Sequence, residues 1–174
     1  PIINLSDAYL FIGKGTIFGI PFPVYIFVLF IIFNVYILHY SKLGRYIYAI
    51  GNNEAAAIAS DVKTKLVKLY VYCSCGPLAG FTGLLLASRT SSAVPNAATG
   101  YELDAIAAAV IGGTSTAGGV GSMYGTTVGI LILGILSNGL DLLNVSSYIQ
   151  QVVKGIVIIA AVLLDVMNKK KTAR

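Results

Sequence analysis

The sequence predicts an all-α fold, a polytopic bundle of transmembrane helices, and three observations support this prediction. Hydrophobic residues make up 56% of the 174 residues and charged residues only 11%, whereas an average soluble domain is roughly 45–50% apolar with Gly included. The mean hydropathy is +0.82. Apolar stretches of about 20 residues, long enough to cross a hydrocarbon core of ~30 Å, recur along the chain. We expect residues 1–174 to form part of one transmembrane domain.

The charges indicate how these helices are oriented. The formal net charge is +5, and Lys and Arg gather at residues 42–68 and 169–174. Basic clusters beside apolar stretches are typical of cytoplasmic loops, and the aromatic and basic interleaving of a nucleic-acid binder is missing from the sequence. We therefore expect a multi-pass protein that contacts membrane lipid, has its C-terminus in the cytoplasm and binds no nucleic acid.

The first elements are a loop and a transmembrane helix. Residues 1–21 are broken by polar residues and glycines, and are predicted to form an extramembrane loop. Residues 22–40 contain no acidic residue, Lys or Arg, and form the first predicted span. An amide inside such a span needs a partner, so we expect Asn34 to bond to a neighbouring helix, with a contact to a transported solute as the alternative.

A polar cytoplasmic loop, residues 41–68, follows the first span and is the largest surface that the chain offers to a soluble partner. Its centre is predicted to be a short helix. Gly51 supplies a turn, Asn52 or Asn53 can cap the helix, and Glu54 complements the positive end of its dipole. Three alanines with high helix propensity come next.

The second predicted span covers residues 69–88, with a kink at Gly76-Pro77. Gly76 and Gly80 give this helix a small-residue face suited to close packing. Cys73 and Cys75 are two residues apart in a helix and point in different directions, which suits neither a redox pair nor a metal site. They are expected to be small buried hydrophobes.

Counting the crossings identifies a less obvious span. Residues 124–140 and 148–166 are strongly apolar. Two cytoplasmic basic clusters require an even number of crossings between them, so residues 101–117 are predicted to be a further span, which makes about five in total. This segment is short, rich in Ala and Gly, and expected to break near Gly112-Gly113 while buried among other helices.

Small and charged residues mark the last spans. Glu102 and Asp104 open the segment at 101–117 and are expected to compensate its helix dipole, whereas Lys154 is expected to snorkel at a membrane edge.

Glycines recur at four-residue spacing on one helical face. These residues are Gly121, Gly125 and Gly129. Close helix packing is the first interpretation of that face, and a surface that slides during transport is the alternative.

The residue inventory argues against an enzyme. The chain has one histidine and no HExxH motif, and its acidic residues lie at predicted membrane edges, so no catalytic residue and no metal site is predicted. A catalytic Ser-Lys pair that includes Lys154 is an alternative, but no other feature of the sequence supports it. No ion-selective filter motif is evident. A capped cytoplasmic helix is typical of a pump whose ATPase is a separate chain, because a secondary transporter needs no docking helix.

Three ordered segments resemble the ribose-type sugar permeases of bacterial ABC importers. The first is residues 44–56, GRYIYAIGNNEAA, and the second is residues 100–108, GYELDAIAA, with the glycine-rich residues 112–119. The third is residues 138–140, NGL, with residues 145–148, VSSY. The resemblance covers nearly the whole chain and corresponds to the C-terminal half of a family member.

The resemblance implies a permease subunit in the bacterial inner membrane that binds no cofactor of its own. A second permease copy completes the pathway, an extracytoplasmic binding protein delivers a monosaccharide such as ribose, and a cytoplasmic ATPase subunit binds the ATP. Members of this family have a coupling helix that docks on the ATPase. The resemblance assigns this helix to six residues of the present sequence. These are Asn52, Asn53, Glu54, Ala55, Ala56 and Ser60. Ser60 departs from the wider importer motif, which has Gly at this position.

A permease must release its solute, so its pathway is predicted to show scattered hydroxyls and amides instead of a dedicated carboxylate-lined pocket. The candidates are Asn34, Thr114, Ser115 and Asn138. The alternative function is a secondary transporter of a small polar solute, such as a sugar or an amino acid. A membrane scaffold without transport activity comes third.

Overall fold

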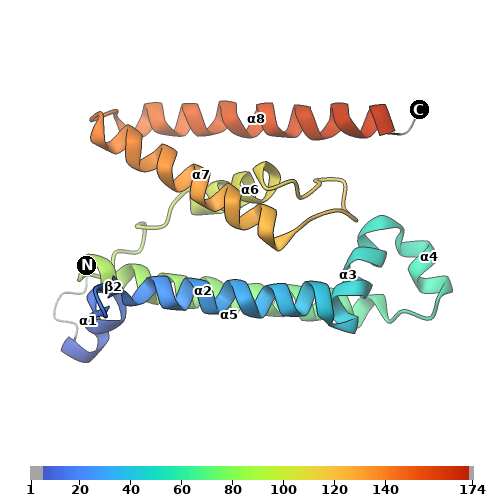
Figure 1. Ribbon diagram of the computed structural model, residues 1–174, viewed down its shortest axis with the longest axis horizontal. Helices are drawn as coiled ribbons and strands as arrows, with labels where there is room; N and C mark the ends of the chain where they lie inside the picture. The colour runs from blue at the N-terminus through green and yellow to red at the C-terminus, as the bar shows by residue number, and fades with distance from the viewer. Residues whose placement is uncertain (1–5, 173–174) are drawn as a thin grey trace.

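The computed structural model describes residues 6–172, and across this part of the chain the regular secondary structure is helical apart from one short β-hairpin. The helices form two groups (Figure 1). Helices α2 and α5 lie along the lower side of the view, with α1 at one end and α3 and α4 at the other, and α6, α7 and α8 lie above them. The predicted all-α membrane fold is confirmed.

The first segment is more ordered than the predicted loop. Helix α1, Asp7–Lys14, is followed by strands β1, Thr16–Ile17, and β2, Ile20–Pro21, which pair antiparallel. The turn between them has positive φ at both Phe18 and Gly19, as a two-residue hairpin turn of type I′ requires. Helix α1 packs on α5, because the amide of Gly13 donates to the buried Ser88 hydroxyl at 2.8 Å.

Helix α2, Phe22–Val35, continues as a π-helical segment, Tyr36–Tyr40, and together they cover the residues of the first predicted span. The expected bond from Asn34 to another helix is wrong. Its amide instead donates to the carbonyl of Phe30 in the same helix at 2.8 Å, because the carbonyl one turn earlier lies within reach of a short side chain.

The polar loop contains two helices, α3, Lys42–Asn52, and α4, Glu54–Ala59. Ser41 begins α3, since its hydroxyl accepts a hydrogen bond from the amide of Gly44 at 3.2 Å. A side-chain oxygen at this position satisfies one of the free amides of the first turn. The predicted short helix is therefore α4, and α3 is an additional helix that connects it to the first span.

Helix α5, Thr64–Thr90, runs without interruption through Pro77, so the predicted kink does not break it. Cys73 and Cys75 are both exposed on α5, and the prediction that they are buried is wrong for this chain. The aromatic rings of Phe30 and Phe81 lie 5.6 Å apart and join α2 to α5.

The second group contains α6, Tyr101–Ile111, α7, Met123–Leu142, and α8, Ser147–Thr172. Buried Ala107, Ala108 and Leu133 form the centre of its core. The predicted break is confirmed, because α6 ends at Ile111 and Gly113 has a φ of +84°.

Three helical segments are long and apolar enough to cross a membrane. They are Phe22–Tyr40, Thr64–Thr90 and Met123–Leu142, and α8 contains a shorter apolar stretch, Tyr148–Leu163. With 11 residues, α6 rises about 16 Å, roughly half the hydrocarbon thickness. The total of five spans stays a prediction. The C-terminal end of α8 lies towards the same end of the molecule as α3 and α4 (Figure 1).

Candidate functional site

The candidate site is the surface of α4, and it begins at Asn53, the residue that caps this helix. Asn53 is extended between the two short helices, with φ −155°, and its side-chain oxygen accepts a hydrogen bond from the amide of Ala56 at 3.1 Å. Asn52 is instead the last residue of α3. Of the two predicted capping residues, Asn53 therefore caps α4.

Helix α4 turns most of its surface outwards. Ala57 is its only buried residue, while Glu54, Ala55, Ala56 and Ser60 are exposed. The side chain of Ile58, which the sequence did not single out, is 56% exposed. Ile58 and the alanines therefore leave apolar side chains on the outer surface of α4.

Glu54 forms an ion pair with Lys68 of α5, with 2.6 Å between the carboxylate oxygen and the ammonium nitrogen. Both side chains are about half exposed, at 47% and 45% respectively. The pair joins the start of α4 to the first turns of α5. An exposed pair of this kind adds only about 0.2–1 kcal/mol, so Glu54 remains available to a partner.

Ser60 ends α4 in a conformation that any residue can adopt, with a φ of −90°. Its hydroxyl donates to the carbonyl of Ala56 at 3.0 Å. The left-handed position is the next residue, Asp61, at a φ of +59°. This turn therefore does not require Gly at position 60.

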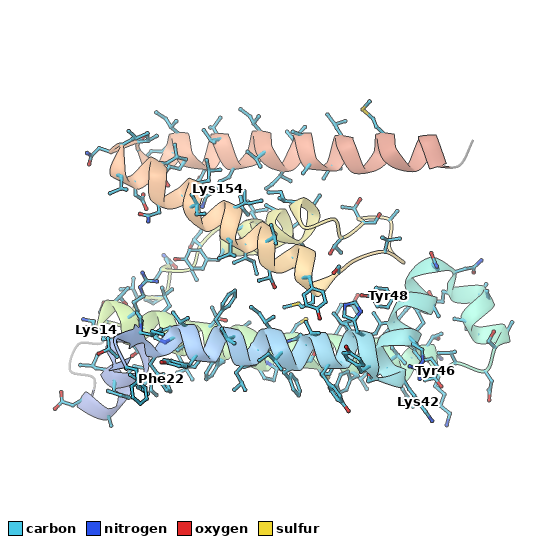
Figure 2. The ribbon with its side chains drawn as sticks, in the orientation of Figure 1. Lys14, Phe22, Lys42, Tyr46, Tyr48 and Lys154 are labelled. Atoms are coloured by element: carbon cyan, nitrogen blue, oxygen red, sulfur yellow. The ribbon has the colours of Figure 1, made fainter. Side chains whose placement is uncertain are left out.

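Helix α3 contacts the glycine-rich turn between α6 and α7, which we define as residues 113–121. The Tyr48 hydroxyl donates to the carbonyl of Gly121 at 3.0 Å, and Figure 2 shows Tyr48 at the end of the molecule that carries α3 and α4. A Cβ atom added at Gly51 would lie 2.6 Å from the backbone nitrogen of Gly119. The two backbones meet where neither has room for a side chain.

The conformation of the glycine-rich turn explains its composition. Gly113, Gly118 and Gly119 all have positive φ, which costs other residues energy and glycine very little. The amide of Ser115 donates to the carbonyl of Val120 at 2.9 Å across the turn, and the Ser115 side chain is buried. Glycines at these positions allow a compact turn whose backbone lies directly against α3.

Glycines also bring α6 and α7 into direct backbone contact. A Cβ atom added at Gly125 would overlap the carbonyl of Gly112, and one at Gly129 would overlap the carbonyl of Ala108. Gly121 lies in the glycine-rich turn before α7, so the prediction that it shares a helical face with Gly125 and Gly129 is wrong. A Cβ atom added at Gly121 would lie 3.1 Å from the Thr114 side chain. Gly76 and Gly80 differ, because among residues 6–172 no heavy atom outside their own helix lies within 4 Å of a Cβ added there.

A charged pair joins α6 to α8, with 2.8 Å between the Asp104 carboxylate and the Lys154 ammonium group. Their side chains are 32% and 21% exposed, respectively. The sequence placed Asp104 at a helix dipole and Lys154 at a membrane edge, and no local spacing signals a pair 50 residues apart. A cavity of about 320 Å³ opens beside the pair.

The four predicted pathway residues lie in different places. Asn34 lines a cavity of about 360 Å³ between α2 and α5, and Asn138 is exposed on α7. Thr114 and Ser115 belong to the glycine-rich turn, where the Thr114 hydroxyl lies 3.4 Å from that of Thr126. The structure brings only Thr114 and Ser115 together.

His39 packs its ring against Tyr124, with 5.5 Å between the ring centres. This contact joins the end of the first span to the start of α7. Across the described residues, His, Cys, Asp and Glu side chains form no group of three that would hold a metal ion.

Comparisons with known proteins identify the relatives of this chain. Residues 1–162 match the family model described as branched-chain amino acid transport system / permease component. Ribose import permease protein RbsC of Escherichia coli K12 is 52% identical over 166 residues, which is 95% of this chain and 51% of that protein. The protein of the same name in Bacillus subtilis is 50% identical, over 99% of this chain and 53% of that protein.

A more distant relative is the xylose transport system permease protein XylH of Haemophilus influenzae. It is 42% identical, over 88% of this chain and 41% of that protein. The chain thus spans about half the length of the curated relatives it matches. No solved structure matches it.

Proposed function

Since the chain belongs to the branched-chain amino acid transport system / permease component family, we propose that it is a permease subunit of an ATP-driven importer of a monosaccharide such as ribose. Relatives named for ribose import and xylose transport support the sugar class. The permease forms the pathway through the membrane and has no catalytic site. A separate ATPase chain binds and hydrolyses ATP.

The observation that supports coupling to an ATPase is the continuous contact from α4 to the α6–α7 hairpin. Helix α4 exposes Glu54 and Ile58, and α3 connects it to the glycine-rich turn through Tyr48 and Gly51. Closely packed atoms cannot approach further, so a displacement of α4 also displaces α3 and the glycine-rich turn.

The proposed mechanism uses this contact as a relay. Closure of the ATPase moves α4, α3 moves with it, and the glycine-rich turn transfers the displacement to α6 and α7. Because Gly125 and Gly129 place α7 against the backbone of α6, these two helices move as one unit. Their movement opens the pathway alternately towards each side of the membrane.

The same proposal assigns partners and orientation. A second permease copy completes the pathway, and an extracytoplasmic binding protein delivers the sugar. The ends of the molecule that carry α4 and the last turns of α8 face the cytoplasm. The basic residues 169–171 close to the end of α8 support this orientation.

Reversal of one charge tests the docking of α4. In the complete importer reconstituted in vesicles, Glu54→Lys should lower both ATP-driven uptake and the stimulation of the ATPase, since it changes the charge of the docking face. The matched control is the double variant Glu54→Lys with Lys68→Glu, which restores the ion pair within the permease. Docking through Glu54 predicts that the double variant stays impaired; full recovery would show that Glu54 serves only the pair with Lys68.

The energy source separates the proposal from a secondary transporter. Uptake by the unmodified complex should require ATP and should persist when ion gradients are collapsed with ionophores. Uptake that follows an ion gradient in the absence of ATP would favour the secondary transporter.

A further inference from the structure

The cavity beside Asp104 and Lys154 is the feature of this chain that the proposed relay leaves unused. It lies between the start of α6 and the second and third turns of α8, and its volume is about 320 Å³. Polar groups from both helices line it. They include Glu102, Asp104, Gln151 and Lys154. Pockets of about 300–1,000 Å³ are the usual size for small-molecule sites.

The charges in this cavity are unusual for their position. Lys154 lies within the apolar stretch Tyr148–Leu163, about 10 Å along the helix from Ser147 at the rise of an α-helix. Ionisable residues inside such stretches are energetically expensive and commonly mark a pathway. Lys154 avoids an unpaired charge by binding Asp104 at 2.8 Å.

Asp104 also faces a second cavity, of about 350 Å³, between α6 and α7. The Ser137 and Thr126 side chains line this cavity together with Asp104. Thr126 in turn lies beside Thr114 of the glycine-rich turn, with 3.4 Å between their hydroxyl oxygens. Most of the other residues that line this second cavity are apolar, so its polar groups are separate positions and not a continuous row.

We propose that the Asp104–Lys154 pair and the cavity beside it form a weak binding site for a neutral polyhydroxylated solute, a monosaccharide, on its way through the permease. The carboxylate accepts hydrogen bonds from sugar hydroxyls, and the ammonium group donates to sugar oxygens. This inference rests on the proposed function and assigns charged residues to its pathway, where the sequence predicted only hydroxyls and amides.

The pairing of the charges explains both the preference and the weak binding. The pair itself has no net charge, while Glu102 adds a further carboxylate to the cavity, and a neutral polyol can bridge the pair without leaving either of its charges unpaired. Hydrogen bonds to charged groups are stronger than neutral ones, but each group already has its partner. The sugar therefore gains only part of that strength, which suits a site that must release its solute.

Protection from cysteine labelling tests the site directly. In the complete complex with Cys73 and Cys75 replaced by Ser, a Gln151→Cys variant is labelled with a maleimide in the presence and absence of D-ribose. Labelling should slow roughly ten-fold when the sugar is at about ten times its Kd, because the unoccupied fraction falls as 1/(1 + [L]/Kd). Glycine betaine at the same concentration should give no protection.

Two matched variants make the result specific. Val152→Cys, on the next residue and exposed outside the cavity, should be labelled at one rate with or without D-ribose. Adding Asp104→Asn to Gln151→Cys should abolish the protection while the complex still elutes as a single species. Equal labelling of Gln151→Cys with and without high D-ribose would overturn the inference, as would protection that survives Asp104→Asn.

The labelling assay does not depend on ATP, so the two proposals fail separately. A complex that imports the sugar with ATP but shows no protection refutes the site alone. A complex that shows protection but imports without ATP keeps the site and refutes the coupling to an ATPase.

Discussion

Two glycine faces with the same spacing pack differently in this protein. On α7, Gly125 and Gly129 lie against the backbone of α6, where a single methyl group has no room. On α5, a Cβ atom added at Gly76 or Gly80 would meet no atom of another element within 4 Å among the described residues. A small-residue face permits close approach, but only the fold shows which helix uses it.

This difference separates helices that pack backbone against backbone from a helix that leaves its glycine face open. Helices α6 and α7 are in backbone contact with each other and, through the glycine-rich turn, with α3. Helix α5 contacts its neighbours through Phe81, Ser88 and Lys68 and leaves its glycine face open. The first group is suited to transmit a displacement.

The largest expected effect is that of a methyl group between α6 and α7. Gly125→Ala should lower the free energy of unfolding by about 1–3 kcal/mol, the usual cost of overpacking, because its Cβ overlaps the carbonyl of Gly112. Thermal unfolding of the purified protein in detergent measures the change. Unchanged stability would mean that the two backbones separate at no cost.

The next effect concerns the contact between α6 and α8. A double-mutant cycle with Asp104→Ala and Lys154→Ala should give a coupling energy of about 1 kcal/mol, near the top of the range for pairs that water still reaches. Unfolding of the four proteins under one set of conditions measures it. A coupling energy near zero would show that the pair does not hold α6 to α8.

The open face should respond in the opposite direction. Gly80→Ala is expected to raise the stability of the isolated chain by about 0.5–1 kcal/mol, because alanine favours a helix interior over glycine and finds no obstacle here. Thermal unfolding under the conditions used for Gly125→Ala measures it. A loss of stability would show that this face is covered.

The smallest effect is expected at the exposed pair of Glu54 and Lys68. Their coupling energy, from the same kind of cycle with alanine variants, should be about 0.3 kcal/mol and should fall as salt is added. A value as large as that of Asp104 and Lys154 would show that exposure does not decide the strength of these pairs.

Local chemistry was enough to predict most of the elements. Apolar length placed residues 22–40, and α2 with its π-helical continuation covers the same stretch. Asn53 and the alanines after Glu54 predicted α4 with its cap, and Gly112-Gly113 predicted the end of α6. In each case the signal lies within a few residues of the feature.

The remaining features depend on contacts between distant residues. Asp104 and Lys154 pair across 50 positions, and Tyr48 reaches Gly121 across 73, so no local spacing reveals either contact. Cys73 and Cys75 were expected to be buried because their type usually is, but no described element covers that part of α5. The candidate site could be predicted at α4, whereas its connection to α6 and α7 could not.

The contact between α3 and the glycine-rich turn is the centre of the proposed relay, and the ratio of sugar imported to ATP hydrolysed tests it most directly. This ratio is measured in vesicles for Gly51→Ala, whose Cβ would lie 2.6 Å from the nitrogen of Gly119, and for Gly76→Ala, whose Cβ meets nothing among the described residues. The relay predicts that Gly51→Ala keeps its ATPase activity but imports less sugar per ATP, while Gly76→Ala matches the unmodified complex. An unchanged ratio in Gly51→Ala would contradict the relay.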